Sequence, residues 1–284
     1  MEDRMRGPGL VVCIFALLSL STVVDAQSAS TGAAVPDIPR FMLKVEEHQR
    51  RVEEIRESYT FSSSRTLQHV DADGKILTTE TEEREDFFVN GHPIERIVKR
   101  NGKPLDDHDR SKETERITKL VEKAQKTPRS REPISIARLL EIMDVSNQRR
   151  ENFRGRPTIV FDFSGRKNAR THGLAEDASK KVKGTIWIDE ADLQVAHLEV
   201  AFIGNFHVMG GLFANIQKGS SFRLDQGLVN GELWLPTSAE GSLQMRVLLM
   251  KNTRQQFIER DYNYKRFTVD AEQAKDVRIK TTKP

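Results

Sequence analysis

Hydrophobic and polar positions follow two different periods along the chain. From Ile38 to residue 57, apolar side chains recur at helical spacing between charged residues, which predicts an amphipathic helix. Residues 58–100 and 144–269 are instead rich in β-branched and aromatic residues, which favour extended strands. The pattern therefore predicts two runs of strands, with one helix before the first run.

Turn signals divide both runs into hairpins. The first run contains Asp71 to Gly74, Asn90-Gly91 and Asn101-Gly102, which suit tight turns between antiparallel strands. We expect a meander of at least three strands there. In the second run, residues 182–189 and 193–203 form a predicted hairpin, and further strands end near Asn230-Gly231 and Gly241.

Residues 105–143 separate the two runs and are predicted to be a helical excursion. The stretch 106–126 is dense in charge, which indicates a solvated helix or a mobile segment. Pro128 and Pro133 end this charged stretch. Residues 134–143 have a strongly apolar face that includes Leu139, Leu140 and Met143, and they predict a short helix.

Strands in two runs without βαβ alternation indicate an α+β fold. Many strands must close or hide their edges, so we expect a strongly curved antiparallel sheet or half-open β-barrel with helices covering its concave face. The interpretation assigns residues 38–270 to a single domain of this kind, with 271–284 as a polar tail.

The N-terminus has the features of a secretory signal peptide over residues 1–26. Arg4 and Arg6 precede an apolar run from Leu10 to Leu20, and small residues follow at the predicted cleavage site. A start at Met5 would leave a cleaner basic end. A membrane anchor is the alternative, but the run is about half of the ~20 residues that a spanning helix needs. Residues 27–37 are predicted to be a flexible linker.

Cysteine usage and charge indicate the cellular compartment and the kinds of partner to expect. Cys13 is the one cysteine and lies inside the apolar run, so a processed chain has no disulfide, thiol nucleophile or cysteine-bound metal. That favours a bacterial periplasm or the cell exterior. Forty-five Lys and Arg stand against 42 Asp and Glu, so charge does not indicate a nucleic-acid partner. The remaining chain has no second apolar run of spanning length, and we expect a soluble protein without a stable membrane span.

Basic clusters at residues 148–156 and 166–170 have two interpretations. They could meet an anionic surface such as lipid head groups, or they could be a solvated sheet edge kept from aggregating by its charge. Both remain open at this point.

The sequence predicts no catalytic residue, no metal site and no cofactor. Residues 106–109 (Asp-Asp-His-Asp) cannot all converge on one ion, and an N-capping acidic turn fits them better. Asp71 to Gly74 lacks the later ligands of a calcium loop and is interpreted as a hairpin turn. The seven histidines are scattered, with no partner at a known catalytic spacing.

Two segments repeat one pattern, Gly184-Thr-Ile-Trp187 and Gly231-Glu-Leu-Trp234. The two tryptophans could line a ligand cavity. The favoured interpretation is that they are core residues on neighbouring strands, because aromatic side chains bury a large area in any fold.

The order of these features resembles the LolA/LolB-like superfamily of periplasmic lipoprotein-sorting proteins, which includes sensing domains of the RseB type. The resemblance covers most of the chain after the signal peptide. It rests on the early helix, the meander, the helical excursion and the later segments at residues 155–163, 184–189 with 195–199, 231–236 and 262–267.

This resemblance implies a half-open β-barrel with a helical lid over an apolar cavity, in a carrier or sensor that is not an enzyme. The partner would be an amphiphile such as a lipoprotein acyl chain, and the location the periplasm. We expect five cavity or lid residues, Trp187, Trp234, Leu139, Leu140 and Met143. An envelope protein-interaction or stress-sensing module is the alternative, and a hydrolase built from the scattered polar residues is a third.

Overall fold

The computed structural model describes residues 34–71, 73–128, 136–208, 214–247 and 253–266. The signal peptide predicted at 1–26, most of the predicted linker and the predicted tail therefore lie outside the described residues. The described helices are α2 (Ile38–Glu57), α3 (Asp107–Lys126), α4 (Ile136–Ile142) and α5 (Gly173–Ser179). None of them is long and apolar enough to cross a membrane.

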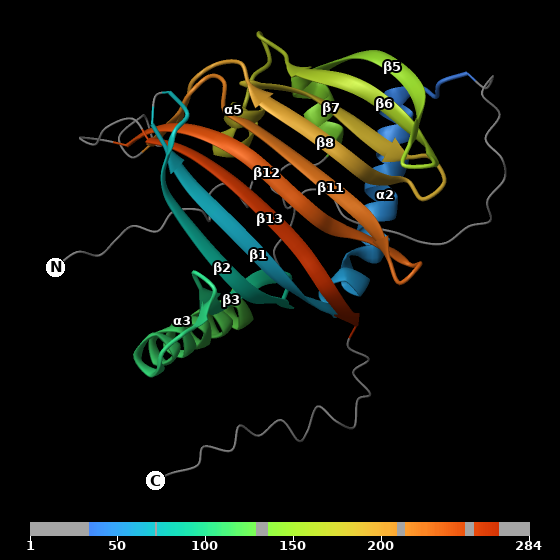
Figure 1. Cartoon of the computed structure of the whole chain (residues 1–284). Helices are drawn as coiled ribbons and strands as arrows, with labels where there is room; N and C mark the ends of the chain where they lie inside the picture. The colour runs from blue at the N-terminus through green and yellow to red at the C-terminus, as the bar shows by residue number, and fades with distance from the viewer. Residues whose placement is uncertain (1–33, 72, 129–135, 209–213, 248–252, 267–284) are drawn as a thin grey trace.

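In the part of the chain that the structure describes, thirteen strands form one sheet, and neighbouring strands pair antiparallel (Figure 1). The strands are β1 (Tyr59–Val70), β2 (Ile76–Val89), β3 (His92–Arg100), β4 (Lys103–Pro104), β5 (Met143–Phe153), β6 (Arg156–Gly165), β7 (Val182–Asp189), β8 (Gln194–Phe202), β9 (Phe206–Val208), β10 (Ala214–Ile216), β11 (Ser221–Val229), β12 (Leu233–Val247) and β13 (Thr253–Arg266).

The last strand joins the two runs of strands into one sheet. The order is β4-β3-β2-β1-β13-β12-β11-β8-β7-β6-β5, with β9 and β10 attached beside β12. Figure 1 shows β13 between β1 and β12. The sheet curves but does not close, because β4 and β5 at its two ends do not pair with each other. The predicted α+β class and open antiparallel sheet are confirmed.

Asn-Gly turns set the hairpins, as the sequence predicted. Asn90-Gly91, Asn101-Gly102 and Asn230-Gly231 all have positive φ at both residues, which is the backbone that these turns require and that asparagine and glycine tolerate. At Asp71 the carboxylate accepts hydrogen bonds from the amides of Asp73 and Lys75. That segment is a hairpin turn, as expected.

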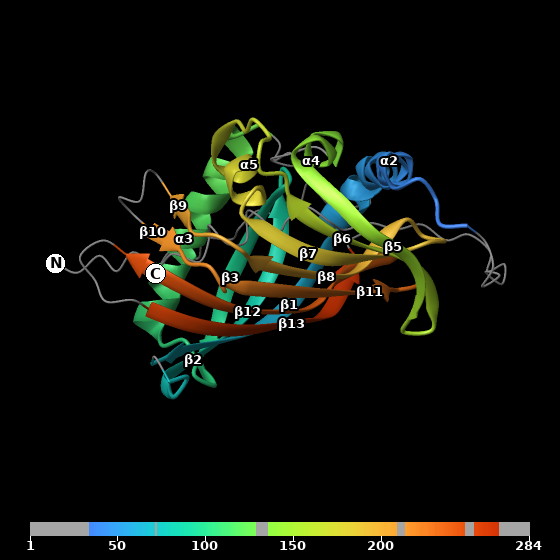
Figure 2. The ribbon, with the colours of Figure 1, turned by 90° about the horizontal axis from the view of Figure 1, so that it is seen from above.

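The apolar core lies between one face of the sheet, called here the inner face, and the helices α2, α4 and α5. Figure 2 shows the three helices on the same side of the sheet. Phe41 and Val45 of α2 belong to the same buried cluster as Phe161, Ile186 and Leu198 of the strands. The amphipathic helix therefore packs over the sheet, because its apolar stripe is wide enough to cover β6, β7 and β8.

Helix α3 lies at the other end of the sheet, against β3 and β2. Its N-cap is Asp106, whose carboxylate accepts a hydrogen bond from the amide of Asp109 at 2.8 Å. The acidic segment at 106–109 is thus the predicted capping turn. Glu113 and Ala124 are buried on α3, and most of its remaining residues are exposed.

Two details of the sequence interpretation are wrong. The short helix ends at Ile142, and Met143 is instead the first residue of β5. The two tryptophans are not on neighbouring strands, since β8 and β11 separate β7 from β12. Helix α5 was not predicted, because its seven residues are too few to show a helical period.

Gly184 is required by close packing. A Cβ atom at this position would lie 2.1 Å from the carbonyl oxygen of Glu199 and 2.5 Å from Cζ of Phe163. We expect Gly184→Ala to destabilise the fold by about 1–3 kcal/mol, since overpacking forces the backbone to shift. Urea denaturation measures the loss. Gly204→Ala is the matched control, because its nearest neighbour, a flexible Lys181 side chain, is 3.4 Å away. Equal stabilities of the two variants would contradict this account.

Candidate functional site

Along the sheet, the inner face changes from apolar to charged. Strands β6, β7, β8 and β11 present apolar side chains to the helices. Residues paired across antiparallel strands share a face, so the registers extend the inner face from Leu224 through Ala239 to Glu259 of β13, and from there to Arg65 of β1 and Glu82 of β2. On these last strands the inner face is charged.

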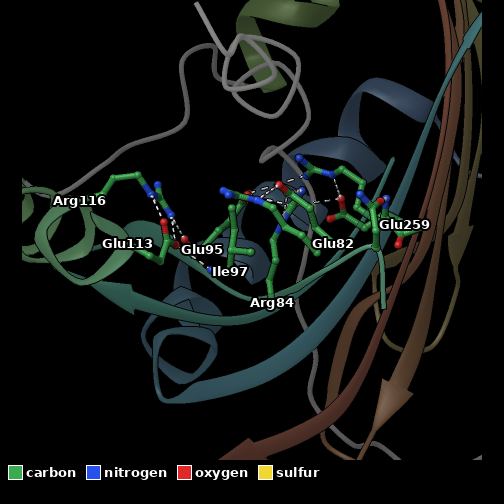
Figure 3. A network of polar contacts seen from close by, with 11 residues as sticks. Glu82, Arg84, Glu95, Ile97, Glu113, Arg116 and Glu259 are labelled. Carbon is green, nitrogen blue, oxygen red and sulfur yellow. Dashed lines mark hydrogen bonds and ion pairs between the residues drawn. The ribbon is translucent and has the colours of Figure 1, made fainter. Parts of the chain in front are cut away.

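Arg84 is the centre of this charged region. It is only 4% exposed, and its guanidinium contacts three carboxylates: Glu82 at 2.9 Å, Glu95 at 3.0 Å and Glu259 at 3.7 Å. Figure 3 shows these side chains gathered on one side of β2 and β3. Arg65 pairs with Glu259 as well. A buried cation needs such partners, because losing water without compensation costs several kcal/mol.

The same row of polar contacts continues to α3. Glu113 accepts a hydrogen bond from the amide of Ile97 at 2.8 Å, and Arg116 donates to Glu113 and to the carbonyl of Glu95 (Figure 3). The two-residue strand β4 pairs only with Lys99 and Arg100 of β3. Glu113 therefore occupies an amide on the part of β3 that β4 does not cover, and it attaches α3 to the sheet edge.

Three acceptor atoms beside this network have no hydrogen-bond partner among the described residues. They are Oδ2 of Asp86, Oγ of Ser63 and Oδ1 of Asp261. Asp86 is 6% exposed and Ser63 is 1% exposed. Ser63 is the Cα partner of both Arg84 on β2 and Asp261 on β13, so the three residues share the inner face. A buried acceptor without a partner is costly and requires an explanation.

Burial changes the acidity of both carboxyls. It raises the pKa of Asp86 from 3.8 to about 7; the nearby Ser63 hydroxyl and Arg84 oppose the rise, and the Glu95 and Glu259 carboxylates add to it. It raises the pKa of Asp261 to about 8, with Glu259 and Asp86 adding to the rise. The two groups therefore exchange protons near neutral pH, unlike ordinary aspartates.

An aromatic pocket lies at the C-terminal end of α2. Its volume is about 60 Å³, several times the ~10–15 Å³ that one water molecule needs. The hydroxyl of Tyr264 donates to the carbonyl of Pro236, and that of Tyr59 donates to Glu232. Because both hydroxyls are engaged, the rings offer apolar surface. The pocket is lined by Arg56, Tyr59, Phe61, Phe88, Leu235, Pro236 and Tyr264.

The pocket and the unpartnered acceptors are neighbours on the sheet. Phe61, which lines the pocket, is the Cα partner of Asp86. Phe88, also in the lining, lies two residues after Asp86 on the same strand and therefore on the same face. An apolar ligand group in the pocket would consequently have its polar end within reach of Asp86 and Ser63. We take this combination as the candidate site.

The predicted lid residues lie elsewhere on the inner face. Leu139 and Leu140 of α4 pack against the buried core cluster, and Met143 is part of that cluster. Arg138 holds α4 to α5 through hydrogen bonds to Glu176 at 2.8 and 3.0 Å. The structure thus brings Leu139, Leu140 and Met143 together in the core.

The two tryptophans are separate from these residues and from each other. Trp187 donates to Glu151 at 3.0 Å and has its ring 4.8 Å from that of His197. Its register places it on the outer face, opposite Ile186. Trp234 donates to Asp192 at 2.8 Å and has Arg156 above its ring. Neither tryptophan is part of the pocket lining.

Neighbouring carboxylates neutralise much of the positive charge in the basic clusters. Arg150 pairs with Glu190, Arg154 with Asp225, and Arg156 with Asp189 and Asp192. Ion pairs within the sheet therefore account for these arginines. Among the residues that the structure describes, no three His, Cys, Asp or Glu side chains gather as metal ligands.

Neither the pocket nor its polar border was predicted from the sequence. Phe61, Phe88 and Tyr264 come from three distant segments, which only the β1–β2 and β1–β13 pairings bring together. One signal was present: Arg84, Asp86 and Phe88 alternate along a strand in which Glu82, Glu83 and Glu85 are also charged. In such a strand, charge does not show which face is buried.

The chain has low similarity to a few solved protein structures. No protein-family model and no curated protein matches the chain. Solved structures similar to it include a DUF1329 family protein from Desulfovibrio piger ATCC 29098 (11% identity, TM-score 0.35, 84% of this chain and 97% of that one). A second is a putative outer membrane lipoprotein-sorting protein domain from Vibrio parahaemolyticus (9%, 0.35, 83% and 98%).

A third similar structure is MucB in complex with MucA(peri), at 8% identity and a TM-score of 0.22, over 77% of this chain and 97% of that one. The lipoprotein-sorting and MucB structures confirm the resemblance to lipoprotein-sorting and RseB-type proteins that the sequence indicated. The three structures are similar to this chain over 77–84% of its length, at 8–11% identity.

Proposed function

We propose that this protein is a non-catalytic periplasmic binding protein for an amphiphile, whose apolar part enters the aromatic pocket at the end of α2. The observation that carries the proposal is the pocket itself, whose tyrosine hydroxyls are engaged elsewhere and whose rings offer apolar surface beside a polar border. Binding gains about 25 cal/mol per Å² of apolar area removed from water.

A longer tail would need more room than the pocket provides. In this proposal it gains that room by displacing α4, whose Leu139 and Leu140 pack on the core as partly buried side chains. The helix is seven residues long, is attached to α5 through Arg138, and packs on the core through Leu139, Leu140 and Ile142. In the proposal, contacts with the tail replace these core contacts. Such an exchange lets the protein release its ligand as well as capture it.

The pocket is tested with octan-1-ol, titrated into the full chain by calorimetry. We expect Phe88→Ala to weaken octanol binding at least tenfold, because it removes one aromatic wall. Phe87→Ala is the matched control: it removes the same side chain from the other face of β2, where Phe87 pairs with Ile94. Failure of octanol to bind the unaltered chain, or equal losses in both variants, would refute the proposal. Capture of an envelope protein without amphiphile binding would favour the interaction module.

A further inference from the structure

We propose that Asp86, Ser63 and Asp261 hold the protonated primary amine of the amphiphile whose tail lies in the aromatic pocket. This inference deepens the proposed function and rests on it. It names the polar end of the ligand, for which the pocket alone gives no preference.

The number and kind of polar atoms match an ammonium group. Oδ2 of Asp86, Oγ of Ser63 and Oδ1 of Asp261 are three buried acceptors without a partner among the described residues. A primary ammonium carries three N–H donors and no acceptor. Ser63 is paired with Asp261 on β13 and with Arg84 on β2, and Asp86 lies two residues after Arg84 on the same face. The three residues are therefore neighbours on the inner face, and one amine between them would donate to all three.

The surrounding charges leave room for one more cation. Arg84 is already shared among Glu82, Glu95 and Glu259, and Arg65 is engaged with Glu259. Arg56, the cation in the pocket lining, lies over the ring of Phe88 at 5.0 Å. Asp86 and Asp261 bring two further carboxyls without a further arginine. An anionic head group would meet these acids unfavourably, whereas an amine would pair with them.

The site also predicts how binding depends on pH. The charged and titratable groups that face Asp86 are Arg84 on its own strand, Glu95 on β3, Arg65 on β1, and Glu259, Asp261 and Tyr264 on β13, with Arg56 of α2 beside the pocket. Because burial raises the pKa of Asp86 to about 7, this carboxyl is largely protonated at pH 5.5. An ammonium ion binds the ionised form, so amine affinity increases from pH 5.5 to 8.

The test compares octylamine, octan-1-ol and octyltrimethylammonium in calorimetric titrations of the full chain at pH 5.5 and 8. We expect octylamine to bind at least tenfold more tightly than octanol at pH 8, and this advantage to shrink at pH 5.5. Octyltrimethylammonium carries the charge without N–H donors, so it should show little of the advantage.

Two variants locate the effect. Asp86→Asn should abolish the amine advantage, measured as the ratio of octylamine affinity to octanol affinity in the same variant. Glu85→Gln is the matched control, since Glu85 lies on the other face of β2 and is half exposed; it should leave both affinities unchanged. Equal binding of octylamine and octanol, or an amine advantage that survives Asp86→Asn, overturns the inference while the pocket proposal stands. Absence of octanol binding refutes the pocket proposal instead.

Discussion

Replacing Arg84 with methionine is expected to destabilise the fold by about 2–4 kcal/mol. Methionine fills a similar volume, but it leaves Glu82, Glu95 and Glu259 without their common cation. Removing one partner of a buried ion pair costs about 3–5 kcal/mol. These carboxylates are 20–35% exposed, so water offsets part of the loss. Urea denaturation followed by circular dichroism measures the change.

The matched control is Arg96→Met on β3. Arg96 pairs with Glu85, but both side chains are about half exposed, and such a pair contributes about 0–1 kcal/mol. The fold is expected to tolerate this change. If Arg84→Met and Arg96→Met had the same small effect, the buried network would not hold β2 and β3 against β13, and the account of the charged inner face would fail.

Replacing Asp86 with asparagine is expected to stabilise the ligand-free protein at pH 8. Folding raises the pKa of this carboxyl from 3.8 to about 7, so the native state binds its proton more tightly than the unfolded state does. Stability therefore falls as pH rises from about 4 to 7, and the cost is fully present above that range. Each pKa unit corresponds to about 1.4 kcal/mol. The gain at pH 8 is therefore up to about 4 kcal/mol.

Thermal unfolding at pH 5 and pH 8 measures this effect. The unaltered chain should melt at a higher temperature at pH 5 than at pH 8, and Asp86→Asn should reduce that difference. Asp261, whose pKa is raised to about 8, keeps part of the dependence in the single variant, so the double variant Asp86→Asn/Asp261→Asn should reduce it further. If Asp86→Asn were less stable than the unaltered chain at pH 8, the claim that the ionised Asp86 carboxylate destabilises the native state would be wrong.

Local signals in the sequence predicted most of the elements. The Asn-Gly turns placed the hairpins, because few other residues accept the positive φ found at Asn90 and Asn230. The spacing of Phe41, Met42 and Val45 placed α2 on the sheet. Both signals act within a few residues, so one sequence suffices to identify them.

The pairing of distant strands could not be predicted in this way. Strand β13 lies between β1 and β12, and its contacts with β1 join residues about 200 positions apart. That pairing creates the candidate site, since it brings Asp261 beside Ser63 and Tyr264 beside Phe61. No local period encodes it. The expectation that Trp187 lines a cavity has a similar weakness, because alternation along β7 does not say which face is inner.

The structure divides the inner face between two tasks. On β6, β7, β8 and β11 it is apolar and packs against the helices. On β1, β2 and β13 it is charged and buried, and the aromatic pocket adjoins its unpartnered carboxyls. A solely structural region would be expected to satisfy Asp86 and Ser63 internally. A ligand with an apolar tail and an amine would satisfy both parts at once.

The most direct test is native mass spectrometry of the full chain in the presence of octylamine, without detergent. The account predicts a one-to-one adduct with the unaltered chain that persists in Phe87→Ala and is lost in Phe88→Ala. No adduct on the unaltered chain, or an adduct that both phenylalanine variants retain equally, would contradict binding of an amphiphile in the aromatic pocket.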